Sequence, residues 1–141
     1  MSLAWWDEQL RAGRRIVGLG GSDTHVLKGE PARDRLGCPT TWAQTTERTP
    51  EAILEALRAG QAFISRDPSG PELYLDHSLR LRAVGAPRSV LMLISARGVE
   101  SAALVDSNDW STTVPAPNGY LRAQLIDAYG QLLALTNPIY Q

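Results

Sequence analysis

The chain has 141 residues, of which 43% are hydrophobic and 21% are charged, as in an ordinary globular protein of one domain or two small ones. Its net charge is −1, and the sequence has no block of like charge. It therefore gives no strong signal for nucleic-acid binding or for a polybasic membrane surface. No apolar run approaches the roughly 18 residues of a membrane span, and the single cysteine, Cys38, excludes an internal disulfide. We therefore expect no membrane association and favour a cytoplasmic setting, in which thiols stay reduced.

The first part of the chain mixes helix and strand signals. Residues 4–13 place apolar side chains at helical spacing and stop at Gly13. Residues 49–60 begin with Thr49 as a helix cap and Pro50 at the first helical position. Strands are expected at residues 15–19, 40–44 and 61–65, with a polar loop at 26–39.

The second part is dominated by β signals and begins after the turn-forming residues 66–71. Strands are expected at residues 72–76, 78–83, 89–95, 101–106, 120–127 and 131–135. Turn residues separate them about every eight to twelve positions, which is typical of a small antiparallel sandwich. The sequence thus predicts an α/β plus all-β chain, with one domain at residues 1–68 and a β-sandwich at residues 69–141.

The segment Gly20-Gly21-Ser22-Asp23-Thr24-His25 carries the clearest chemical signal, because it directly follows the apolar run at residues 16–19. In an extended segment the side chains of Asp23 and His25, two positions apart, point to the same face. A carboxylate oxygen and an imidazole nitrogen side by side suit a Zn, Mn or Fe ion. These two residues are therefore the candidate metal ligands.

Two other interpretations of this segment stay open. An aspartate after Gly-Ser often caps a helix or closes a turn, and a catalytic zinc usually needs three protein ligands, whereas this chain has two histidines. A dinucleotide-binding loop is the second alternative, but Asp23 occupies the position where that motif needs its third glycine.

Four segments, taken in order, resemble a known family. They are residues 20–25, the run Gly37-Cys38-Pro39-Thr40-Thr41-Trp42, residues 53–65, and the ending Ala134-Leu135-Thr136-Asn137-Pro138-Ile139-Tyr140. Together they resemble the C-terminal part of a PHP-type (polymerase and histidinol phosphatase) metal-dependent phosphoesterase, of the two-domain kind with a terminal β domain.

The resemblance implies a distorted (β/α)7 barrel, of which residues 1–68 would be the last segment. It implies that Asp23 and His25 are metal ligands, in a parent enzyme where a metal-bound hydroxide attacks phosphorus. The substrate would be a phosphorylated small molecule or a nucleotide, and the cofactor two or three divalent ions (Mn, Zn or Fe). The family's earlier ligand motifs do not occur in this chain, so we expect the fragment to be inactive alone and to form homo-oligomers through exposed barrel edges.

A non-catalytic binding or assembly module in the β-sandwich is the alternative function. In that case Trp110, Tyr120 and Tyr129 would form a contact surface, although burial in the core is the commoner fate of aromatic residues. His77 is expected to be an exposed turn residue. Residues 106–109 are expected to form a hairpin turn, because they lack the later glycine and glutamate of a calcium loop.

Overall fold

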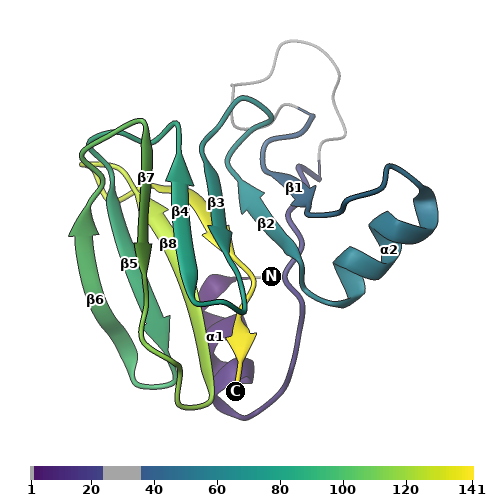
Figure 1. Cartoon of the computed structure of the whole chain (residues 1–141), viewed down its shortest axis with the longest axis horizontal. Coiled ribbons are helices and arrows are strands. Elements are labelled where there is room, and N and C mark those ends of the chain that lie inside the picture. The colour runs from purple at the N-terminus through teal and green to yellow at the C-terminus, as the bar shows by residue number, and fades with distance from the viewer. Residues whose placement is uncertain (1, 24–35) are drawn as a thin grey trace.

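The computed structural model describes residues 2–23 and 36–141, in which two short helices accompany ten strands (Figure 1). Helix α1 (Leu3–Arg11) is capped by Ser2, whose Oγ accepts a hydrogen bond from the Trp5 amide at 3.3 Å. Helix α2 (Pro50–Arg58) is capped in the same way by Thr49, with Pro50 in its first turn. Helix α2 thus begins as Thr49 and Pro50 predict, whereas α1 begins one residue before the expected residue 4. Neither helix, within the described residues, has the length and apolarity needed to cross a membrane.

All the strand pairings are antiparallel and belong to two sheets. The larger sheet has the order β1-β2-β9-β8-β5-β6, with β10 pairing β8, and the smaller has the order β3-β4-β7. The strands are β1 (Thr40–Ala43), β2 (Ala62–Ser65), β3 (Glu72–Leu75), β4 (Arg80–Val84), β5 (Val90–Ser95), β6 (Gly98–Leu104), β7 (Asp109–Thr113), β8 (Tyr120–Ile126), β9 (Leu132–Thr136) and β10 (Ile139–Tyr140).

The main hydrophobic core lies between the two sheets, and Figure 1 shows the smaller sheet in front of the larger. Along β8, Leu121, Ala123 and Leu125 belong to this core, in the alternation expected of a strand. Leu73 and Leu81 meet them from the smaller sheet and are completely buried. The β-rich prediction is therefore confirmed.

Helix α1 forms a second, smaller core with the larger sheet. Trp6 and Leu10 pack with Tyr120 and Leu135, which come from β8 and β9. Arg122, also on β8, forms a buried ion pair with Asp7 of α1; its two nitrogens lie 2.8 and 2.7 Å from the carboxylate oxygens. The helix is thus fixed to the sheet by both apolar and charged contacts.

Several expected elements differ from those observed. Residues 109–113 form β7, which the sequence did not reveal because its side chains are mostly exposed and polar and show no apolar alternation. The short β10 was also missed, and residues 106–109 do not close a hairpin, since β6 pairs with β5 while β7 pairs with β4. These residues instead lead the chain from one sheet to the other.

The larger sheet contains strands from both sides of the predicted boundary between residues 68 and 69, because β2 pairs with β9. The division into two domains stays a prediction. Within the described residues, β1 and β2 pair antiparallel, whereas neighbouring strands of a (β/α) barrel are parallel. The barrel segment therefore belongs to the proposal made below.

Candidate metal centre

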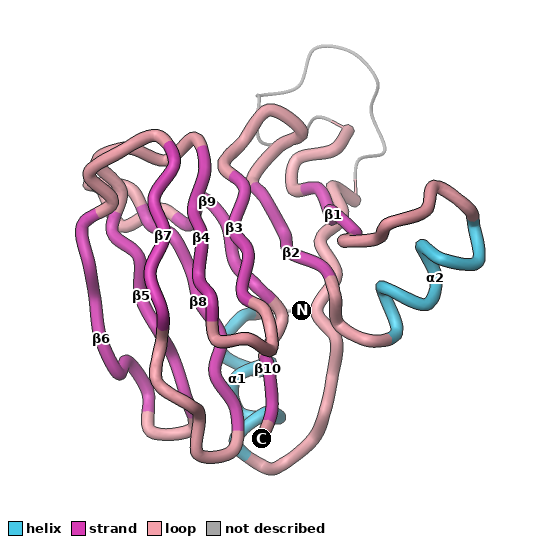
Figure 2. The backbone as a smooth tube through the Cα atoms, viewed as in Figure 1, coloured by secondary structure: helices cyan, strands magenta, loops and turns pink. Residues whose placement is uncertain are grey.

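The segment that leads to Asp23 is held by a side chain from the far end of the chain. Residues 14–23 form no strand, although a strand was expected at 15–19, and Figure 2 draws them as a loop that passes from α1 toward β1. The buried Asn137 amide replaces a partner strand: its Oδ1 accepts from the Gly18 amide at 2.7 Å, and its Nδ2 donates to the Gly18 carbonyl at 3.1 Å. The strand prediction is wrong within the described structure because a ladder needs a second backbone, and here a side chain occupies that place.

The same asparagine joins this segment to the sheet. Asn137 Nδ2 also donates to the carbonyl of Ala62, the first residue of β2, at 3.1 Å. Its amide therefore makes three hydrogen bonds to backbone groups, which is nearly its full capacity. It follows that Asn137 is a structural anchor of the path toward Asp23.

Thr41 anchors the same segment two positions after Gly18, at Gly20. Thr41 Oγ1, on β1, accepts from the Gly20 amide at 2.8 Å and donates to the Gly20 carbonyl at 2.9 Å. The backbone approaches β2 so closely here that a Cβ built on Gly20 would lie 2.5 Å from Ile64 Cγ2. Only glycine fits this place without a shift of its neighbour.

We expect Gly20→Ala to lower the free energy of unfolding by about 1–3 kcal/mol, because the added methyl overpacks the contact with Ile64. Gly21→Ala is the matched control, since a Cβ at Gly21 would meet nothing within 4 Å. Urea denaturation of both variants measures the difference, and truncating Ile64 to Ala in the Gly20→Ala background should restore part of it. Equal stability of the Gly20 and Gly21 variants would contradict the close approach.

Asp23 lies at the end of this segment with an exposed side chain. Its φ angle is +48°, in the left-handed region that aspartate tolerates better than most residues. The regular alternation of an extended strand therefore does not pass through Asp23, so the shared-face argument that linked it to His25 does not apply as stated. His25 lies outside the described residues, and the ligand pair stays a prediction.

The described ranges, 2–23 and 36–141, contain no group of three or more His, Cys, Asp or Glu side chains placed to hold a metal ion. His77 lies exposed in the turn between β3 and β4, as expected. Asp109 is the last residue of the segment compared above with a calcium loop. Its carboxylate accepts from Nε and Nη2 of Arg82 at 2.8 and 2.7 Å. This guanidinium beside it lowers the pKa of the Asp109 carboxyl, which is ion-paired in place of binding a cation.

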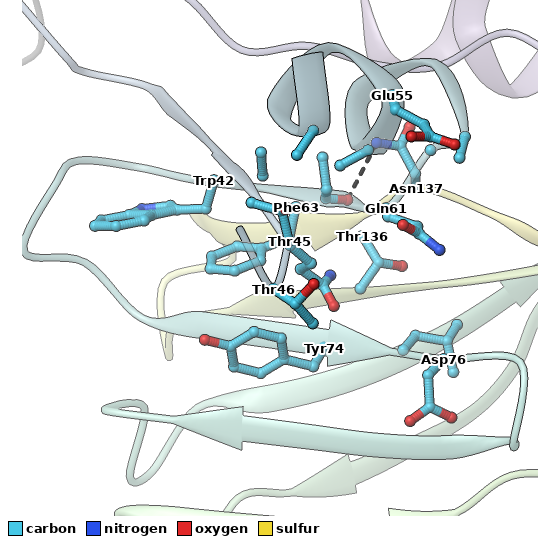
Figure 3. A pocket seen from close by; sticks show the side chains of 18 of the residues that line it. Trp42, Thr45, Thr46, Glu55, Gln61, Phe63, Tyr74, Asp76, Thr136 and Asn137 are labelled. Carbon is cyan, nitrogen blue, oxygen red and sulfur yellow. Dashed lines mark hydrogen bonds between the residues drawn. The ribbon is translucent and has the colours of Figure 1, made fainter. Parts of the chain in front are cut away.

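An open groove of about 980 Å³ lies between α2 and the two sheets (Figure 3). Three rings form one end of it: Trp42 stacks on Phe63 with centroids 6.3 Å apart, and Phe63 meets the edge of Tyr74 at 5.0 Å. Figure 3 shows Glu55 and Asp76 away from these rings. The groove thus combines an aromatic end with a polar, acidic end.

Tyr74 is held as a neutral phenol in this groove. Burial, followed by the hydrogen bond that its hydroxyl donates to Glu72 at 2.5 Å, raises its pKa to about 12. A phenol with so high a pKa is a hydrogen-bond donor and not a proton acceptor at neutral pH. Its hydroxyl is already used by Glu72, so the ring contributes a wall of the groove.

The aromatic contact surface considered for the second half is not formed. Tyr120 is 3% exposed and belongs to the core under α1, and Trp110 packs partly buried against the core between the sheets. Tyr129 alone of the three is open, at 90% exposure. The three residues therefore do not share one exposed face.

No protein-family model, no curated protein and no solved structure matches this chain.

The residues that matter most structurally, Asn137 and Thr41, were visible in the sequence only as parts of the resemblance. Their partners lie 119 and 21 positions away, so no local pattern could assign their role.

Proposed function

We propose that this chain is the C-terminal part of a PHP-type metal-dependent phosphoesterase, which hydrolyses phosphate esters of small molecules or nucleotides. Asp23 and His25 are its contributions to the metal centre, and the remaining ligands come from a longer parent protein. Residues 14–23, which form no strand in the described structure, lead to Asp23 in this proposal.

The support for this proposal is that the four segments carrying the resemblance are joined to one another by hydrogen bonds. Gly20, from the first, is bound by Thr41, from the second. Asn137, from the fourth, is bonded to Ala62, from the third, and to Gly18 just before the first. Segments that are scattered through the sequence thus form one structural unit that leads to Asp23.

The exposed apolar side chains give independent support. Of the ten large ones exposed among the described residues, six lie between residues 5 and 54: Trp5, Leu19, Leu36, Trp42, Ile53 and Leu54. Helix α2 buries only Ala56 fully, although its apolar stripe is wider. An apolar surface concentrated in one part of a chain indicates a missing packing partner, as a barrel fragment would have.

The described donor set does not by itself fit a metal cluster. Asp23 is the single described ligand of the candidate centre, and a two-metal site needs several bridging and terminal ligands. We therefore derive no catalytic step for this chain and expect phosphate-ester hydrolysis at background rate, with Mn or Zn present. Turnover that Asp23→Ala abolishes would show that the chain completes a site without the parent.

The ligand assignment can be tested through the paramagnetism of Mn²⁺. We expect weak binding that broadens the NMR signals around residues 22–25. The double variant Asp23→Asn/His25→Gln should weaken it by at least about tenfold, since even the outer partners of metal ligands change affinity by 10- to 100-fold. His77→Gln, which removes the chain's other histidine, is the matched control and should leave the broadening unchanged. Broadening elsewhere, or broadening that the double variant retains, would contradict the proposal.

Self-association is the second expected property of the fragment, because β1 is an edge strand that carries the exposed Trp42, and α2, which contacts β1, exposes Ile53. Light scattering should show a mass above that of one chain, which Trp42→Glu or Ile53→Glu reduces. Tyr129→Glu, a change at a more exposed ring in the turn after β8, should have no effect. A monodisperse monomer at high concentration would rule out this interface.

A further inference from the structure

A second hollow, of about 310 Å³, lies where the end of α2 meets residues 15–17 and the C-terminal strand. Its charged and ionisable lining residues are Arg15, Arg58, His77 and Tyr140, and no carboxylate side chain lines it within the described residues. The adjoining groove is the opposite, since Glu47, Glu51, Glu55 and Asp76 line it. Both arginines therefore line the smaller hollow and not the acidic groove, although the two hollows adjoin and share His77.

The two arginines of this hollow have no ion-pair partner in the described part of the chain. Four other arginines do pair with a carboxylate: Arg66, Arg82, Arg97 and Arg122. Arg15 lies instead over the ring of Tyr140, with its guanidinium carbon 4.7 Å from the ring centroid. This cation–π contact orients Arg15 and leaves its N–H donors available.

Arg58 is not needed to cap its own helix. The last carbonyls of α2 already accept backbone hydrogen bonds from Ala59, Gly60 and Gln61, which close the helix end. The negative end of the helix dipole amounts to about half a charge and opposes an anion there, but the two guanidinium charges outweigh it. Arg58 is thus free to face a ligand.

The remaining polar groups in the hollow are consistent with an anion. Asp76, which precedes His77, lines the adjoining groove and not this hollow, and its Oδ1 accepts from the amides of Ser78 and Arg80 at 2.9 and 3.2 Å. His77 has an N–H to donate in either protonation state. Guanidinium forks match the geometry of phosphate oxygens and bind them with two hydrogen bonds each.

We propose that Arg15, Arg58 and His77 form a binding site for a phosphate dianion, either free or at the end of a small molecule. Asp23, the described residue of the candidate metal centre, does not line this hollow. The phosphate site needs no metal, so it stands or falls independently of the proposed phosphoesterase function.

The test is an NMR titration of the whole chain with inorganic phosphate and with glycerol phosphate, in EDTA and at constant ionic strength. We expect saturable shifts at the amides of Val17, Gly60 and Tyr140, and an affinity lowered about tenfold or more in Arg58→Gln and in Arg15→Gln. Arg48→Gln, an exposed arginine outside the hollow, is the control and should bind as the wild type does.

The two ligands separate the possible sources of the phosphate group. Tighter binding of glycerol phosphate would assign the hollow to a phosphorylated small molecule, and equal binding would assign it to phosphate itself; both support the site. Arg58 lies on an exposed helix end, so its variant keeps the test valid if Arg15→Gln perturbs the packing on Tyr140. Shifts equal to those caused by sodium chloride, or equal weakening by Arg48→Gln, would overturn the proposal.

Discussion

Asn137→Ala is expected to lower the free energy of unfolding by about 3 kcal/mol. The side chain is 3% exposed, and its removal leaves the amide and carbonyl of the buried Gly18 without their present partner. The carbonyl of Ala62 loses one bond but still accepts from the backbone amide of residue 137 at 3.3 Å. Each buried polar group left unsatisfied costs about 1–3 kcal/mol, and partial relaxation or water entry reduces the sum. Urea denaturation of the variant measures the loss.

Asn118→Ala is the control for this prediction, because Asn118 is exposed in the bend before β8. It should leave stability within about 0.5 kcal/mol of the wild type. Hydrogen exchange adds a local measurement: the Gly18 amide should lose its protection in Asn137→Ala before the amides of β8 do. A variant as stable as Asn118→Ala, with Gly18 still protected, would show that another group holds this segment.

Asp7→Ala should destabilise the fold by about 3 kcal/mol or more, since it leaves the Arg122 guanidinium, whose side chain is 1% exposed, without its carboxylate partner. Arg122→Met should cost less, because an apolar side chain of similar length suits the site over Trp6. The double variant should resemble Arg122→Met alone. A thermodynamic cycle of these variants measures the coupling between the two charges.

The pair formed by Arg82 and Asp109 provides a matched comparison. It has the same forked geometry and the same shortest distance of 2.7 Å, but both side chains are exposed. Asp109→Ala should therefore change stability little, and high salt should remove what effect there is. Equal losses of stability on removing Asp7 and on removing Asp109 would show that burial does not set the size of the effect.

Local patterns predicted the elements that local chemistry determines. The capping of α2 by Thr49 and Pro50, and the alternation along β3 and β4, were sufficient to place those elements to within a few residues. Residues 15–19 have the composition of a strand, but no other strand pairs with them in the described structure. Strand β7 is paired with β4, but its exposed, polar residues do not have the composition of a strand. Pairing is a property of the whole fold, so the sequence of either segment was not enough.

The candidate site shows the same division. The motif around Asp23 was recognisable from residue types alone, whereas the anchoring role of Asn137 depends on a contact with Gly18 across 119 positions. The charged hollow at Arg15, Arg58 and His77 is also assembled from three distant segments. The spacing of these residues in the sequence does not indicate that they lie close together in the fold.

The bond between Gly18 and Asn137 also sets an order of events during synthesis. The segment that leads to Asp23 is made early, but its anchor follows β9, the last strand but one. Contacts between such distant residues form late, because the chain between them must first be closed into a loop. We therefore expect a ribosome-bound chain that stops short of Asn137 to lack the anchor at Gly18, even where Thr41 already holds Gly20.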